Sequence, residues 1–244
     1  MEEQQKHFTL SRDFLKYFAV FCMVLDHIAW YFLAFRTPTA QVFHILGRIT
    51  APVMCFFLAQ GARYTHNMAR YLMRMLIFAV AAQLPWWCLH KSQKFSLNML
   101  FTLFFCLLML YIDSLDLPVA VRAGGIVLCI LATNYCDWSF HAPLWCLIFY
   151  HLHSNRKKET LAFSIVALSY YAKAVIRRLD VNYTPQQALT ESLFTLGVFL
   201  ALPLLFLADQ SKQEGKRSAF SKWFFYVFYP LHLGIIALIK IFTE

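Results

Sequence analysis

The sequence predicts an all-α fold, a polytopic membrane bundle of about nine transmembrane helices (eight to ten) with a cytoplasmic N-terminus. Composition is the first observation: 60% of the residues are hydrophobic and only 14% are charged, whereas soluble domains average about 25% charged residues. The second observation is that apolar runs recur along the whole chain. We therefore expect a single transmembrane domain, residues 1–244, rather than a soluble domain with one anchor.

Nine apolar segments are separated by short polar stretches. They are residues 14–35, 42–61, 71–89, 97–112, 118–132, 140–153, 161–176, 189–207 and 223–241. A helix needs roughly 20 residues, within about 17–25, to cross a hydrocarbon core about 30 Å thick. The fourth to seventh segments are short by this measure, so a re-entrant segment stays open. The first segment is too long for a signal peptide and lacks a small-residue cleavage site, so we expect a retained helix behind a short cytoplasmic tail, residues 1–13.

The distribution of cations predicts the orientation. If all nine segments cross from a cytoplasmic N-terminus, roughly twice as many lysines and arginines flank the inner ends as the outer ends, in agreement with the positive-inside rule. The chain carries 22 basic and 13 acidic residues. We expect no nucleic-acid partner, because no basic stripe with interleaved aromatic residues is present. Membrane lipid is the expected surrounding.

Polar side chains interrupt several apolar segments at similar depths. Asp26 and His27 are adjacent in the first segment, and an ionisable residue at the bilayer centre costs roughly 2.5–3.5 kcal/mol on insertion scales and usually marks function. Counting 1.5 Å per residue places Arg48, Gln83 and His232 at comparable depths on the second, third and ninth segments. We predict a polar layer in the middle or outer half of the membrane.

An alternative interpretation is that these groups only join helices, through hydrogen bonds of about 0.6–2 kcal/mol. For Gln83 and for two residues that open the fourth segment, Asn98 and Thr102, this interpretation is as good as the functional one. It is weaker for the charged residues, because an arginine at that depth needs a counter-ion and Asp26 is the nearest candidate. His27 lies about 100° further round the same helix and is expected to face a cavity, where an imidazole suits proton transfer.

Five motifs resemble the TraX family. They are "MVLDHI", "GRITAPVMCFFLAQG", "AQLPWW", "NMLFTL" and "FYPLHLGII", which lie in residues 12–105 and 222–236. Residues 106–221 match only as hydrophobic sequence. The family contains the conjugal-transfer protein associated with N-terminal acetylation of F pilin, and it is similar to the acyltransferase-3 membrane enzymes.

The resemblance implies an integral-membrane acetyltransferase of the bacterial inner membrane that uses acetyl-CoA. The acceptor is expected to be a peptide N-terminus, or a glycan or lipid-linked amine or hydroxyl. By position, the family's Asp-His pair falls on Asp26 and His27, its Gly-Arg on Arg48, its asparagine on Asn98 and its late histidine on His232. Tyr229, in the same motif as His232, is expected to join the polar layer.

A mechanism can be stated for these residues. His27 is the expected general base, Asp26 and Arg48 orient the site, and His232 is a second acid/base or an oxyanion donor. Direct transfer and an acetyl-histidine intermediate both stay open. The cofactor's phosphates are expected at inner-side cations, namely Arg63, Arg70 and Arg74, for which topogenic anchoring is the alternative.

Two other classes of protein are rivals. A proton-coupled transporter would use the charged residues as a relay, but it predicts inverted repeats and helices broken at related positions, and no such repeat is visible. A non-catalytic membrane assembly factor would make the polar layer structural. No GxSxG, P-loop or dinucleotide motif occurs. No metal site is expected, because the two histidines of "HLH", residues 151–153, point about 200° apart on a helix.

Overall fold

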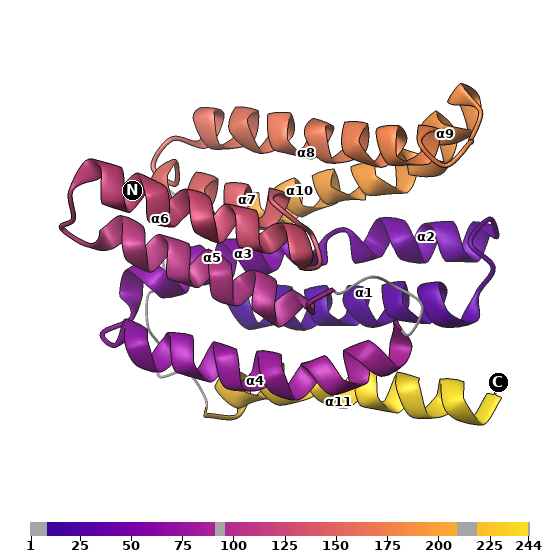
Figure 1. Ribbon diagram of the computed structural model, residues 1–244, viewed down its shortest axis with the longest axis horizontal. Coiled ribbons are helices and arrows are strands. Elements are labelled where there is room, and N and C mark those ends of the chain that lie inside the picture. The colour runs from indigo at the N-terminus through magenta and orange to yellow at the C-terminus, as the bar shows by residue number, and fades with distance from the viewer. Residues whose placement is uncertain (1–8, 91–95, 209–218, 244) are drawn as a thin grey trace, which may run out of the picture.

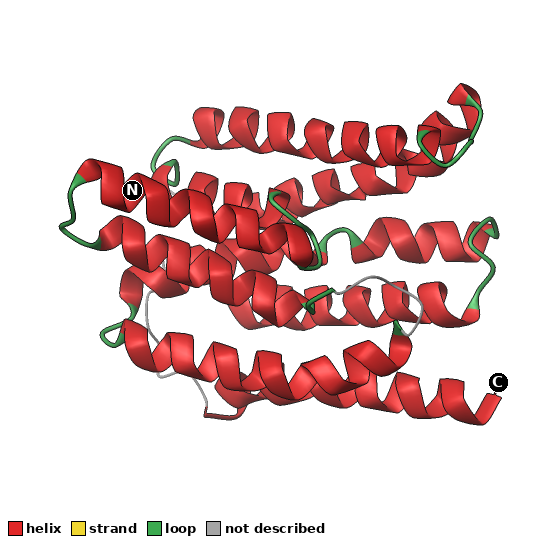
Figure 2. Ribbon diagram, viewed as in Figure 1, coloured by secondary structure: helices red, strands yellow, loops and turns green. Residues whose placement is uncertain are grey.

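The computed structural model describes residues 9–90, 96–208 and 219–243. Within these ranges the chain is helical almost throughout, and most helices run along the long axis of the molecule (Figures 1 and 2). In order, the elements are α1 (Arg12–Phe32), α2 (Pro38–Gly47), α3 (Thr50–Tyr64), α4 (Met68–Leu89), α5 (Met99–Ser114), α6 (Val119–Ala132), η1 (Thr133–Tyr135), α7 (His141–His151), α8 (Arg156–Leu179), α9 (Pro185–Ser192), η2 (Leu193–Leu200), α10 (Ala201–Phe206) and α11 (Ala219–Thr243).

The predicted helical membrane bundle is confirmed, and each of the nine apolar segments falls on a helix or a series of helices. Six candidate spans occur in the described residues: α1, α2 with α3, α4, α8, α9 to α10, and α11. The helices α5, α6 and α7 are shorter than a full span. The number of crossings and the cytoplasmic N-terminus therefore stay predictions.

One apolar segment was predicted too short, by several residues at each end. The seventh segment, expected at 161–176 and considered short, is the 24-residue helix α8. The charged residues at both ends lie outside the expected segment, but they continue the helix, because long basic side chains extend toward the interface while their backbone stays helical. Asn155 caps its start by accepting the backbone N–H of Lys158.

The second span is broken near its middle, and a proline explains the position. Pro52 has no backbone N–H, and its ring crowds the carbonyl four residues earlier, that of Arg48. The helix accordingly ends at Gly47 and resumes at Thr50. The break places Arg48 where the backbone leaves the regular helical path.

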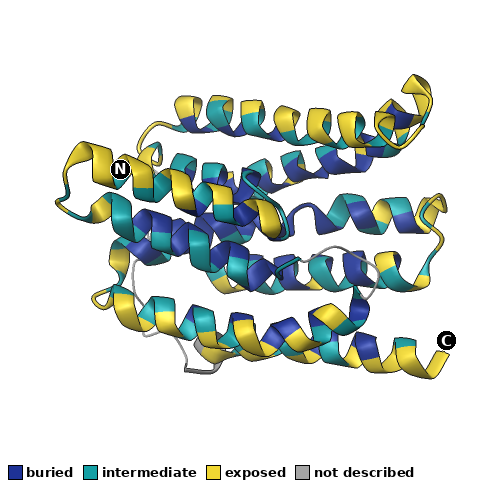
Figure 3. Ribbon diagram, in the orientation of Figure 1, coloured by how far each residue is buried: buried dark blue, intermediate teal, exposed yellow. Residues whose placement is uncertain are grey.

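This broken span is the centre of the bundle. In its most apolar stretch 72% of the residues are buried, against 17% in the corresponding stretch of α8, which lies at the edge of the bundle (Figure 3). Around it, α1 packs on α2 and α3, α7 packs on α3, and α4 pairs with α11. Large apolar side chains on the outer helices face outward; Leu84, for example, is 69% exposed. Such surfaces suit a hydrocarbon environment.

Candidate functional site

The predicted pairing of Asp26 with Arg48 is present. Both residues are 8% exposed. The Nη2 of Arg48 donates to Oδ2 of Asp26, and its Nη1 donates to the hydroxyl of Tyr170 at 3.1 Å. Since an unpaired charge in a membrane interior is costly, this ion pair is the condition under which either residue can be buried here.

A glycine allows the two helices to approach closely enough for this pair. A Cβ built on Gly47 would lie 2.3 Å from the Cβ of Asp26 and 2.5 Å from its Cγ. Real Cβ atoms do not approach other atoms so closely, so a larger residue would push α2 away from α1. The "GR" dipeptide therefore has two parts: the glycine brings the backbones together and the arginine supplies the charge.

A strained turn covers the guanidinium of Arg48. The ring of Trp138 lies over it, with 4.8 Å from Cζ to the ring centroid. Trp138 and Ser139 both have positive φ values, 66° and 49°, which are uncommon for residues other than glycine and a genuine outlier for a bulky side chain. Strain of this kind persists only where the surrounding structure enforces it, and it clusters at functional sites.

The two predicted histidines are joined to each other. The Nδ1 of His27 lies 2.9 Å from the Nε2 of His232, and the Nδ1 of His232 lies 3.0 Å from the carbonyl oxygen of Phe228. A carbonyl can only accept, so His232 carries a proton on Nδ1, and with both rings neutral its Nε2 accepts from His27. In this arrangement the Nε2 of His27 carries no hydrogen. The chain of hydrogen bonds thus leaves a proton-accepting nitrogen on His27.

The remaining predicted polar residues make structural hydrogen bonds. The side chain of Asn98, fully buried, donates to the carbonyl of Ala79 and to Oε1 of Gln83, both at 2.8 Å. The hydroxyl of Tyr229 accepts the backbone N–H of Met99. These bonds hold the start of α5 against α4 and α11, as the helix-joining interpretation describes. A substrate contact for Gln83, Asn98 and Tyr229 stays a prediction.

Thr102 is hydrogen-bonded to a second non-helical segment, residues 136–140, in addition to the break between α2 and α3. Its hydroxyl donates to the carbonyl of Asp137 at 2.5 Å, and the backbone of Leu97 exchanges hydrogen bonds with Tyr135 and Asp137. Such irregular backbone is tolerated in a membrane protein where it is buried within the protein. These contacts carry the strained turn at Trp138 and so help to shape the site.

The three predicted cofactor-binding arginines lie at the ends of α3 and α4 that are remote from the polar layer. Arg63 donates to the carbonyls of Phe149 and Tyr150 at the end of α7, and therefore acts as a helix cap. Arg70 is exposed, and the guanidinium of Arg74 lies over the ring of Tyr71 at 5.6 Å. Arg70 and Arg74 stay available as a pair one turn apart, whereas Arg63 is already engaged.

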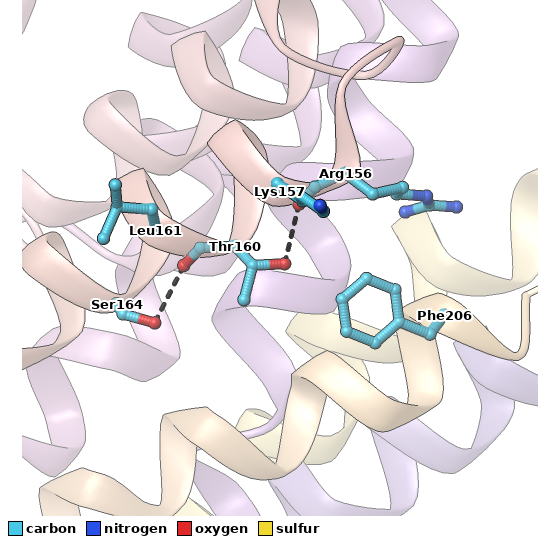
Figure 4. A pocket seen from close by; sticks show the side chains of 6 residues that line it. All are labelled: Arg156, Lys157, Thr160, Leu161, Ser164 and Phe206. Atoms are coloured by element: carbon cyan, nitrogen blue, oxygen red, sulfur yellow. Dashed lines mark hydrogen bonds between the residues drawn. The ribbon is translucent and has the colours of Figure 1, made fainter.

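A hollow of about 480 Å³ lies between α8 and α10, lined by Arg156, Lys157, Thr160, Leu161, Ser164 and Phe206 (Figure 4). Ten residues of α8 separate Thr160 from Tyr170, a rise of about 15 Å. Arg156 is paired with Glu159 at 3.3 Å and lies over the ring of Phe206. The hollow is therefore separate from the polar layer and contributes no side chain to it.

Three residues of the layer escaped the sequence reasoning: His44, Tyr170 and Asp137. The Nδ1 of His44 lies 2.8 Å from Oδ1 of Asp26, and Tyr170 bonds Arg48. A signal existed for His44, since it precedes Arg48 by four residues and so lies on the same helix face. Tyr170 and Asp137 carry no comparable signal, because only the fold brings them near Arg48.

The fold and site define a class, an integral membrane helical bundle with a buried layer of charged and imidazole groups. The chain belongs to the TraX family, whose model, described as TraX protein, matches residues 11–240. It is 32% identical over 241 residues to the probable fimbrial assembly protein FimC, serogroup H1, of Dichelobacter nodosus, covering 94% of this chain and 96% of that relative. No solved structure matches. The family resemblance of the motifs is thus confirmed.

Proposed function

We propose that this protein is an integral-membrane acetyltransferase, which moves an acetyl group from acetyl-CoA to an amine or hydroxyl of an envelope-associated acceptor. The observation that carries the proposal is the hydrogen-bonded chain ending on Nε2 of His27, next to the buried Asp26–Arg48 pair. Polar groups inside a membrane bundle are expensive and usually serve function. Acyl transfer needs a base that accepts the proton of the attacking group and a fixed charge that stabilises the charge developing in the transition state.

In this reaction His27 acts as the general base. Its Nε2 takes the proton of the acceptor amine or hydroxyl while that group attacks the thioester carbon, and the proton then passes to the departing thiolate of CoA. His232, which accepts from Nδ1 of His27, keeps the ring in the required tautomer. Catalysis by a positioned base of this kind contributes about 10²–10⁴-fold.

The acyl donor is placed by the expected topology. With nine crossings and a cytoplasmic N-terminus, in the bacterial inner membrane, the α3–α4 turn is on the side that holds acetyl-CoA. Arg70 and Arg74 are the proposed contacts for its phosphates, because guanidinium groups bind phosphate well. Arg63 contributes by fixing the end of α7. The acetyl arm then reaches the polar layer between the helices.

The acceptor is proposed to be a peptide N-terminus or a glycan of the cell envelope. The relative named as a probable fimbrial assembly protein supports a component of a surface appendage. The same name favours a second candidate function, a non-catalytic assembly factor. In that case Asp26, His27 and Arg48 serve only to fix the fold.

The two functions are separated by one experiment on inverted membrane vesicles. Vesicles carrying the native protein, His27→Ala or His66→Ala at equal expression receive acetyl-labelled CoA and cell extract. His66 is exposed in the α3–α4 turn and serves as the matched control. We expect release of CoA and labelled product with the native and His66→Ala proteins, and a loss of about 10²–10⁴-fold with His27→Ala. No release above empty membranes would contradict the enzyme and favour the assembly factor.

A further inference from the structure

His44 is a buried imidazole that the mechanism above does not use. It is fully buried on α2, one helical turn before Arg48. Its Nδ1 lies 2.8 Å from Oδ1 of Asp26, while the other carboxylate oxygen of Asp26 binds Arg48. Asp26 is thus shared, oxygen by oxygen, between an arginine and a histidine, and among the described residues no hydrogen bond joins it to His27.

The partner of Nδ1 fixes the tautomer of His44. The carboxylate of Asp26, paired with a guanidinium, is an acceptor, so the proton of the neutral imidazole lies on Nδ1. The lone pair then belongs to Nε2. This nitrogen is buried, and it has no hydrogen-bond partner within the part of the chain that the structure describes.

An unpaired buried acceptor calls for an explanation, because leaving one costs about 1–3 kcal/mol. A residue that only had to donate to Asp26 would not need a second nitrogen. The surroundings do not compensate it either: the rings of Trp30, Phe35 and Phe194 lie 4.3, 5.4 and 5.5 Å from that of His44, centroid to centroid. The rings leave this nitrogen in apolar surroundings.

Asp26 and His44 are arranged like the carboxylate and the imidazole of a catalytic triad. The carboxylate holds the ring in one tautomer and stabilises the imidazolium that forms when Nε2 takes a proton. Of the three rings, that of Trp30 lies nearest to His44, and Trp30 is 47% exposed. An acceptor that approaches Nε2 from this side has to move the ring of Trp30.

We infer that His44, held by Asp26, is a second base of the proposed acetyl transfer when the acceptor is an amine, and that its Nε2 takes the proton that the ammonium form carries in excess of the free amine. The free amine then attacks the thioester carbon. As the N–C bond forms and the C–S bond breaks, Nε2 of His27 takes a second proton from the nitrogen and passes it to the departing thiolate, while the proton on His44 leaves to water with the product. One ammonium group and one thioester thus give an amide, a thiol and a proton. The inference rests on the proposed function and adds a residue to it.

Chemical rescue tests this assignment. Native protein, His44→Ala and the control His66→Ala are purified into nanodiscs, and CoA release from acetyl-CoA is measured with membrane extract as the acceptor source. We expect His44→Ala to lose about 10²–10⁴-fold and to regain activity with added imidazole. Pyrazole, of the same size but a far weaker base, should not restore it. The melting temperature of each variant is recorded alongside.

The outcomes are distinct. A native protein that releases CoA together with a His44→Ala variant as active as the control overturns the inference and leaves the proposed function standing. A folded but inactive His44→Ala that neither heterocycle restores also overturns it. If the native protein releases no CoA, both proposals fail. Should His44→Ala not fold, nitrogen-15 NMR of ring-labelled native protein decides: a hydrogen on Nε2 of His44 overturns the inference, and a bare Nε2 supports it.

Discussion

Replacing Gly47 by alanine tests the geometry of the site at a single atom. The added Cβ would lie 2.3 Å from Cβ and 2.5 Å from Cγ of Asp26, whereas an ordinary contact lies at 3.4–4 Å. A carboxylate side chain this short cannot turn away, because both of its oxygens are bound. Helix α2 must therefore shift by about 1 Å, and overpacking of this kind costs about 1–3 kcal/mol.

The matched control is Gly124→Ala on α6, where a Cβ would meet no atom within 4 Å. That change removes a helix-interior glycine and should stabilise by up to about 1 kcal/mol. The two variants should thus differ by about 1–4 kcal/mol in the free energy of unfolding. Unfolding in mixed micelles with increasing SDS measures this difference. Equal stabilities would refute the close approach of α1 and α2.

Three further predictions follow from the hydrogen bonds and ion pairs of the site. Arg48→Ala leaves Asp26 buried without its guanidinium and should destabilise by about 3–5 kcal/mol, which SDS unfolding reports; a loss below about 1 kcal/mol would argue against a buried pair. Asn98→Ala removes the bonds to Ala79 and Gln83 and should cost about 1–3 kcal/mol in the same assay; an unchanged midpoint would contradict it. His27→Ala and His232→Ala should each reduce CoA release, and the double variant should lose little more than either alone, since the two rings act as one unit; additive losses would show that they act separately.

The membrane bundle could be predicted because its signal is spread over the whole chain. Long apolar runs with short polar breaks have few other solutions, since a spanning segment must satisfy its own backbone hydrogen bonds. The predicted bounds of α8 were too narrow, because charged residues such as Arg156 and Arg178 are typical of loops between apolar segments. Helix lengths at an interface depend on packing and solvation that hydropathy alone does not record.

Part of the site was predictable for a related reason. A charge in an apolar run is rare, and depth counting sufficed to match Asp26 with Arg48. His44 precedes Arg48 by one helical turn, but the Gly-Arg motif itself indicates only the arginine. Tyr170 lies 122 residues from Arg48 among many other aromatic residues, so its contact depends on how α8 lies against the broken span. Such a long-range contact leaves no local pattern.

The fate of a labelled acetyl group is the measurement that tests the central claim most directly. Carbon-13 acetyl-CoA is supplied to inverted vesicles carrying native protein or His27→Ala, and the envelope fraction is analysed by mass spectrometry. The account predicts an acetylated peptide or glycan that carries the label only with the native protein, with free CoA formed in step. Label recovered entirely as unreacted acetyl-CoA in both preparations would contradict it and leave the polar layer as a structural device.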